Sequence, residues 1–127
     1  KEWVSMVKQT ITLGQLVHSR SGDKGNHVNI ALICHKKEWL PLLQKTITPE
    51  ILANWFEGWS DGPFEVFPVA GVGAVNCMIH NVLQGGGTVA KRLDAQGKAI
   101  GQVVLDAEIV IDSKLAKEVG FLIPVSQ

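Results

Sequence analysis

A polar segment between two apolar runs constrains the fold of this chain more than any other feature. The segment spans residues 18–29 and reads HSRSGDKGNHVN, and apolar residues dominate positions 11–17 and 28–33 on either side. Runs of this length and composition are typical of β-strands. Gly22 and Gly25 allow the backbone between them to turn through positive φ. We therefore expect a hairpin whose connecting loop is polar.

This loop carries more polar groups than a chain reversal needs, and two interpretations stand. It is either a solvated turn or a binding site, because loops on rigid strands often carry functional groups. As a binding site, the N–H groups of Ser21, Gly22 and Gly25 would form a nest, and Arg20 and Lys24 would attract a phosphate or carboxylate. The spacing does not match a P-loop, because the segment between the glycines is too short and no Lys-Ser/Thr pair follows.

The composition of the chain excludes some classes of partner. Its 127 residues suit a single domain covering 1–127, and a hydrophobic content of 46% suits a globular core. Twelve basic residues balance 12 acidic ones, so no broad positive field is available for nucleic acid. A net charge of zero also favours self-association, and we expect a homo-oligomer.

The cysteines and the apolar runs indicate a cytoplasmic protein. Cys34 and Cys77 are far apart and match no metal-binding spacing, so we expect two buried free thiols, no metal site and no cofactor. No apolar run is long enough to span a membrane, and the first residues contain no signal-peptide segment. The chain starts at Lys1 rather than Met, as expected of a processed or trimmed product.

The middle of the chain predicts helices and an edge strand. Residues 36–44 can form a helix with Pro41 in its first turn, and a second helix begins with Thr48 as N-cap and Pro49 at its first position. Apolar spacing after Pro49 predicts a buried helix face that ends before Gly58. Residues 64–70 predict a strand, and Pro68 places it at a sheet edge.

A Gly-x-Gly pair precedes what the spacing predicts to be a helix over 75–83. The apolar residues there fall at i, i+3, i+4, i+7 and i+8. Gly71 and Gly73 before a helix start would suit an anion. Asn76 stands where the dinucleotide fingerprint has its third glycine, so we favour close helix–strand packing over nucleotide binding. His80 would lie on the polar side of this helix, with no catalytic partner evident from spacing.

The last third of the chain predicts a strand over 88–93, a turn over 94–98 and a long strand over 100–111. A short helix capped by Ser113 would end at Gly120, and residues 121–125 form an apolar tail. The tail either packs on the core or meets a second subunit. The whole order predicts an α+β two-layer sandwich, with helices on one face of a mixed, largely antiparallel sheet.

Several stretches of the chain resemble one family. LVHSRSGDKGN at 16–26, NIA at 29–31, GAVN at 73–76 and LDAQGKAIG at 93–101 together resemble the small C-terminal domain of the AtuA-like proteins, which are linked to acyclic terpene utilisation. The resemblance covers residues 12–109 and implies a ferredoxin-like fold. It also implies a pathway that degrades acyclic isoprenoid acids as CoA thioesters. In this family the small domain usually follows a larger one, so the partner is either a separate chain or a second copy.

Our first hypothesis is a binding and assembly module, because no nucleophile–base set is recognisable. In it, the segments 20–29 and 71–76 form one polar edge that meets an anionic small molecule, such as an acyl-CoA, or a larger AtuA-like subunit. The candidate ligand-binding residues are Arg20, Ser21, Gly22, Lys24, Gly25, Asn26, Asn29, Gly71, Gly73 and Asn76.

The second hypothesis is an enzyme, a hydratase or lyase acting on a small acyl substrate. Asp23 or His27 would move a proton in the reaction. The remaining roles, stabilisation of negative charge and orientation of the substrate, fall to Lys24 or Arg20 and to Asn29 or Asn76. A nucleic-acid module ranks third, because no basic patch interleaved with aromatic residues is present.

Overall fold

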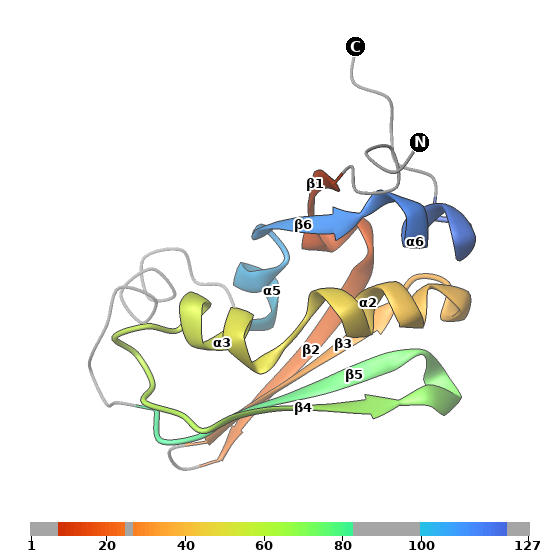
Figure 1. The fold of residues 1–127 in the computed structure, drawn as a ribbon. Coiled ribbons are helices and arrows are strands. Elements are labelled where there is room, and N and C mark those ends of the chain that lie inside the picture. The colour runs from red at the N-terminus through yellow and green to blue at the C-terminus, as the bar shows by residue number, and fades with distance from the viewer. Residues whose placement is uncertain (1–7, 25–26, 83–99, 122–127) are drawn as a thin grey trace.

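The computed structural model describes residues 8–24, 27–82 and 100–121, with Asp23 and Lys24 described by their backbone only. Its strands form two antiparallel sheets (Figure 1). The larger sheet has the order β2-β3-β5-β4 and consists of β2 (Val17–Lys24), β3 (His27–Cys34), β4 (Phe64–Val69) and β5 (Ala74–Ile79). The smaller sheet pairs β1 (Lys8–Thr12) with β6 (Glu108–Asp112). The α+β class is confirmed, although two antiparallel sheets replace the single mixed sheet that we expected.

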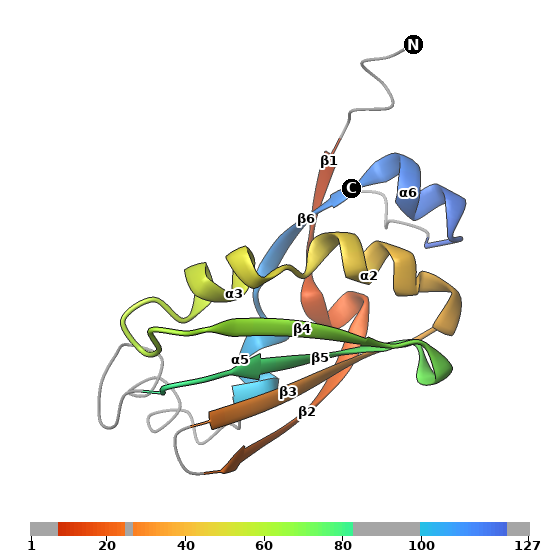
Figure 2. The ribbon, with the colours of Figure 1, turned by 60° about the horizontal axis from the view of Figure 1, so that its bottom comes forward.

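Short helices connect and cover these strands. They are η1 (Leu13–Gln15), η2 (Lys37–Trp39), α2 (Leu40–Thr46), α3 (Pro49–Trp55), η3 (Ala70–Val72), α5 (Ile100–Val104) and α6 (Ser113–Glu118). Helices α2, α3 and α5 lie on one face of the larger sheet, and α2 contacts both β5 and β6 (Figures 1 and 2). We call this the covered face. None of the described elements lies over the opposite face, which we call the open face.

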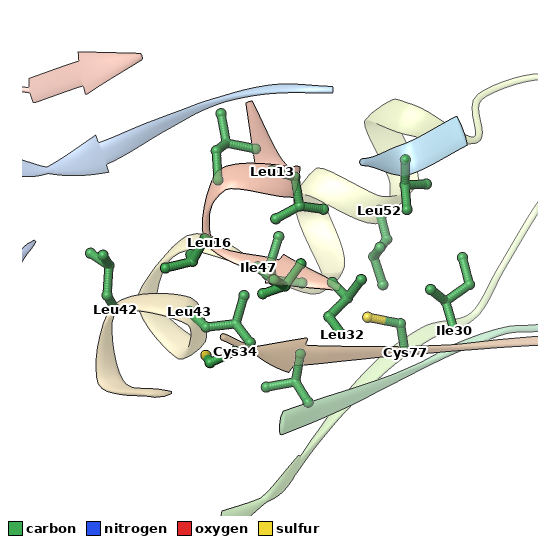
Figure 3. Close-up of a cluster of buried hydrophobic side chains, with 14 of the residues drawn as sticks. Leu13, Leu16, Ile30, Leu32, Cys34, Leu42, Leu43, Ile47, Leu52 and Cys77 are labelled. Atoms are coloured by element: carbon green, nitrogen blue, oxygen red, sulfur yellow. The ribbon is translucent and has the colours of Figure 1, made fainter. Parts of the chain in front are cut away.

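The core lies between the covered face and the helices (Figure 3). Along β3, alternate residues are buried, since successive side chains of a strand point to opposite faces. The buried residues of β3 are Val28, Ile30, Leu32 and Cys34. Leu42 and Leu43 of α2 are fully buried against this layer, together with Ile47 and Leu52. Burial of these apolar side chains is the main force that holds the helices on the sheet.

Several sequence predictions for the middle of the chain are confirmed. The Thr48 hydroxyl accepts a hydrogen bond from the N–H of Ile51 at 3.2 Å, so Thr48 caps α3 as expected. Pro41 lies in the first turn of α2. Phe56 is 1% exposed in the core, and β4 with Pro68 forms an edge of the larger sheet.

The polar segment is mostly strand rather than loop. Strand β2 continues to Lys24 and pairs with β3 residue by residue, from Val17 opposite Cys34 to Lys24 opposite His27. Strand β1 ends at Thr12, and η1 separates it from β2. Gly22 lies within the pairing and has no positive φ. The expectation of a long loop is therefore wrong, because an antiparallel ladder satisfies the backbone groups of these polar residues.

The predicted helix over 75–83 is also wrong, since residues 74–79 form β5. Strand β5 is central and pairs with β3 on one side and β4 on the other. Val75, Cys77 and Ile79 are buried on the covered face, whereas Asn76 and Met78 alternate with them. Val75 and Ile79, four residues apart, fit both periods, and pairing with the two neighbouring strands selects the strand. No helix follows Gly71 and Gly73, so the helix-based anion site is excluded.

The C-terminal third contains a further correction. Residues 100–111 form α5 and then β6, not one long strand. Asp112, rather than Ser113, caps α6, because its carboxylate accepts hydrogen bonds from the N–H groups of Lys114 and Leu115. Phe121 is 4% exposed and packs into the core. The predicted strand over 88–93, the turn over 94–98 and the tail after Phe121 lie outside the described residues.

Candidate functional site

The pairing of β2 with β3 distributes the polar segment over both faces of the larger sheet. Ser19 and Ser21 stand opposite Leu32 and Ile30, on the covered face. The Ser19 hydroxyl donates to the carbonyl of Gly101 at 2.7 Å, and the Gly101 N–H donates to the Ser21 hydroxyl at 3.2 Å. Ser21, a predicted ligand residue, therefore helps to hold α5 on the sheet.

Other predicted residues meet on the open face. Arg20 is exposed and stands opposite Ala31, which in turn stands opposite Asn76 on β5. Gly22 stands opposite Asn29. The side chain of Asn29 donates a hydrogen bond to the side chain of Asn76, and both are half-buried. A guanidinium and two amides side by side can together bind a carboxylate or phosphate.

A line of three titratable side chains lies at the β2–β3 turn end of the same face. His80 Nε2 lies 2.6 Å from Glu65 Oε1, and His80 Nδ1 lies 3.1 Å from His27 Nδ1. A carboxylate only accepts hydrogen bonds, so Nε2 of His80 carries a proton. In neutral His80, Nδ1 then has a free lone pair that faces His27. Carboxylate, imidazole and a second imidazole in series can orient and transfer a proton.

The Gly-x-Gly pair lies at the other end of the sheet. Gly73 precedes Ala74, which stands opposite Ile33, whereas the β2–β3 turn adjoins the far end of β5. Gly73 has φ +67°, and a Cβ there would come within 2.8 Å of Lys37 Cα. Gly73 thus allows close packing against Lys37 of η2, whereas the helix–strand packing that we expected here requires a helix that is not formed. Gly71 lies in η3, so the two predicted polar segments converge only at Asn76.

The remaining predicted residues are placed only in part. Backbone pairing puts Asp23 opposite Val28 and Lys24 opposite His27. Gly25 and Asn26 lie outside the described residues. A pocket of about 220 Å³ opens beside α2, α3 and β4, but none of the predicted site residues lines it. The predicted binding residues Arg20, Asn29 and Asn76 therefore lie on the open face and not in this pocket.

Sequence reasoning missed Glu65 and the partners of His80. The helix expected over 75–83 separated His80 from β3, whereas the strand places it directly after Ile79, which stands opposite Val28. An alternation was present in the sequence, since Val75, Cys77 and Ile79 are apolar and the residues between them include Asn76. Read with period 2, it would have predicted a strand with Asn76 and His80 on the same face.

The two cysteines are the remaining side chains with reactive chemistry that the sequence singles out. Cys34 and Cys77 are free and buried, as predicted. Burial raises the pKa of Cys34 to about 11 and the pKa of Cys77 to about 12, so both are protonated at neutral pH.

Among the described residues, no group of three or more His, Cys, Asp or Glu side chains is arranged to hold a metal ion. In the same part of the chain, no helix is long and apolar enough to cross a membrane.

Comparison with known proteins identifies the family of this chain. No curated protein and no solved structure matches the chain. The model of the AtuA ferredoxin-like domain matches residues 11–110, a range that includes β2, β3, β4 and β5 and therefore the whole open face. The antiparallel sheet with helices on one face agrees with a ferredoxin-like domain. The chain belongs to the AtuA ferredoxin-like domain family.

Proposed function

We propose that this chain is a binding and assembly domain of an AtuA-like protein and that the open face is its contact surface. The observation that carries this proposal is the exposure of large apolar side chains on β4 and in the adjoining η3, at the edge of a sheet that the described helices cover on one face only. Phe67 is 46% exposed, Val69 is 44% exposed and Val72 is 58% exposed. Apolar side chains gathered beside polar ones are typical of protein contact surfaces.

The partner that fits this surface is a larger AtuA-like subunit. Phe67 and Val69 alternate with covered-face residues along β4, so both project from the open face. An aromatic side chain flanked by valines is the kind of anchor that a partner subunit buries. A second copy of the chain is the competing occupant, and the experiment below separates the two.

The polar half of the open face supports a small anionic ligand. Arg20 provides a positive charge, and the amides of Asn29 and Asn76 provide donors beside it. An acyl-CoA ester or a free terpenoid acid has the phosphate or carboxylate groups that this set would bind. A role in the catabolism of acyclic terpenoids agrees with this chemistry and with the family.

Native mass spectrometry tests the proposal. The purified chain is measured alone, with a larger AtuA-like subunit, and with a panel of acyl-CoA esters and terpenoid acids. We expect a complex with the larger subunit that Phe67→Ser abolishes. The matched control is Val110→Ser, since Val110 is 57% exposed but lies on β6, away from the open face. A chain that stays monomeric and takes up none of these molecules contradicts the proposal, and a homodimer assigns the face to a second copy.

A second candidate function is a hydratase or lyase acting on a small acyl substrate. The series Glu65, His80 and His27 favours it, because a carboxylate that orients one imidazole toward another is suited to proton transfer. His27 would then exchange the proton with the substrate, supported by His80 instead of Asp23. Loss of activity in His27→Gln on acyl-CoA substrates would support this role, and unchanged turnover in His27→Gln and Asp23→Asn would exclude both residues.

A further inference from the structure

Two histidines from different strands face each other at one end of the open face. His27 begins β3 and His80 directly follows β5, and Val28 stands opposite Ile79 in the register of these two strands. The two Nδ1 atoms are 3.1 Å apart. His27 is exposed and the His80 side chain is 24% exposed, so solvent reaches the pair. Paired central strands hold the backbones of both residues in place.

The ring geometry suits two imidazoles that point toward one common atom. Zn²⁺ lies about 2.0–2.1 Å from a histidine nitrogen, so two nitrogens at this separation would subtend an angle of about 100° at the ion. Rings in that arrangement would have centroids about 4.8 Å apart, whereas a straight N–H···N hydrogen bond would put them at about 5.4 Å. The observed centroid separation is 4.9 Å, with the ring planes at 77°.

Glu65 fixes the tautomer of His80 and so determines which of its ring nitrogens has a lone pair. Its carboxylate holds the proton of His80 on Nε2, at 2.6 Å, which leaves the Nδ1 lone pair directed at His27. A ligating histidine usually donates its other N–H to a carboxylate or carbonyl group in this way. The donor atoms are imidazole nitrogens, which prefer zinc, copper or nickel over calcium or magnesium.

We infer that His27 and His80 form a binding site for a divalent first-row transition metal, with Glu65 as the residue that positions His80. Within the described part of the chain no third His, Cys, Asp or Glu joins them. Water or a ligand on the open face would therefore complete the coordination, as in metal sites that keep open positions. Arg20, Asn29 and Asn76 lie on the same face, so an anionic ligand there would share it with the ion. This inference does not depend on the partner proposed above.

Titration calorimetry of the full chain with Zn²⁺, and electron paramagnetic resonance with Cu²⁺, test the site. We expect one saturable Zn²⁺ equivalent, tighter binding of Cu²⁺, no binding of Mg²⁺ and hyperfine coupling from two nitrogens in the copper spectrum. His27→Ala should weaken Zn²⁺ binding at least tenfold. Glu65→Gln should weaken it about tenfold, because the orienting carboxylate is lost. Zn²⁺ should also raise the Tm of the wild type and not of His27→Ala.

The second histidine pair of the protein supplies the matched control. The rings of His18 and His35 have centroids 5.7 Å apart, and His35 Nε2 lies 2.9 Å from the carbonyl oxygen of Gly14. His18→Ala should therefore leave Zn²⁺ affinity unchanged. Equal Zn²⁺ affinities of the wild type and His27→Ala would overturn the inference, and so would the absence of saturable binding of either metal. The two Nδ1 atoms would then share a hydrogen bond instead of a metal ion. All these side chains are partly or fully exposed, and circular dichroism checks that each variant is folded.

Discussion

The two faces of the larger sheet are built from the same strands and differ in almost every property. On β3, Leu32 is 1% exposed beneath the helices, whereas its neighbour Ile33 is half-buried on the open face. The covered face is almost wholly apolar, and its serines on β2 are bonded to α5. The open face carries amides, histidines and a carboxylate between apolar residues. The covered face therefore provides most of the stability, and side chains of the open face can serve binding or catalysis.

The largest expected effect concerns the thiols of the covered face. Burial raises the pKa of Cys77 from 9.0 to about 12, so its thiolate fraction near neutral pH is about a thousandfold smaller than in the unfolded chain. We expect Ellman's reagent to react slowly with the native protein and rapidly in denaturant. Rapid reaction of the native Cys34→Ala variant, in which only Cys77 remains, would show that the covered face opens readily.

Truncation of neighbouring residues on β3 compares the two faces directly. Leu32→Ala should lower the free energy of unfolding by about 2–5 kcal/mol, because it leaves a cavity between sheet and helices. Ile33→Ala removes a similar side chain that solvent already reaches, so it should cost about 1 kcal/mol or less. Urea denaturation measures both. Equal losses would mean that something also covers the open face.

A methyl group at Gly101 tests the contact between α5 and β2. A Cβ there would lie 3.0 Å from the Ser19 hydroxyl and 3.1 Å from the Ser21 hydroxyl. Gly101→Ala should therefore lower the free energy of unfolding by about 1–3 kcal/mol. Gly22→Ala is the matched control on β2, because a Cβ at Gly22 meets nothing within 4 Å. If Gly101→Ala is as stable as Gly22→Ala, α5 is not held by these serines.

The smallest effect on stability is expected on the open face itself. Phe67→Ser should change the free energy of unfolding by no more than about 0.5 kcal/mol, since the residue is 46% exposed. The same variant should lose the association with a larger subunit proposed above. Thermal denaturation and native mass spectrometry of one sample give both values. A large loss of stability would make Phe67 part of the fold instead of a contact residue.

The fold could be predicted from the sequence where local signals decided the structure. Thr48 followed by Pro49 is a local signal for a helix start, and Pro68 is a local signal for an edge strand. The prediction failed at residues 75–83, where apolar spacing fits a helix as well as a strand. Only pairing with β3 and β4, which are distant in sequence from each other, selects the strand. The prediction of one long strand over 100–111 failed for a similar reason, because α5 depends on contacts with β2, which is distant in sequence.

The candidate site could be predicted by residue type but not by arrangement. Arg20, Asn29 and Asn76 were singled out for their chemistry, and the register brings them to one face. The partnership of His27 with His80 depends on which residues of β3 and β5 stand opposite each other. A shift of that register by one residue would move every side chain to the other face, so no spacing within the chain could predict it.

The proline on β4 limits how copies of this protein can add to one another. An exposed strand edge normally offers a row of N–H and C=O groups on which another chain can add a strand. Pro68 removes one donor from the β4 edge. Fibre growth by edge-to-edge addition is therefore disfavoured on that side, even at high protein concentration. The other edge of the larger sheet is β2, which contains no proline, so addition of a strand to this sheet would be confined to that edge.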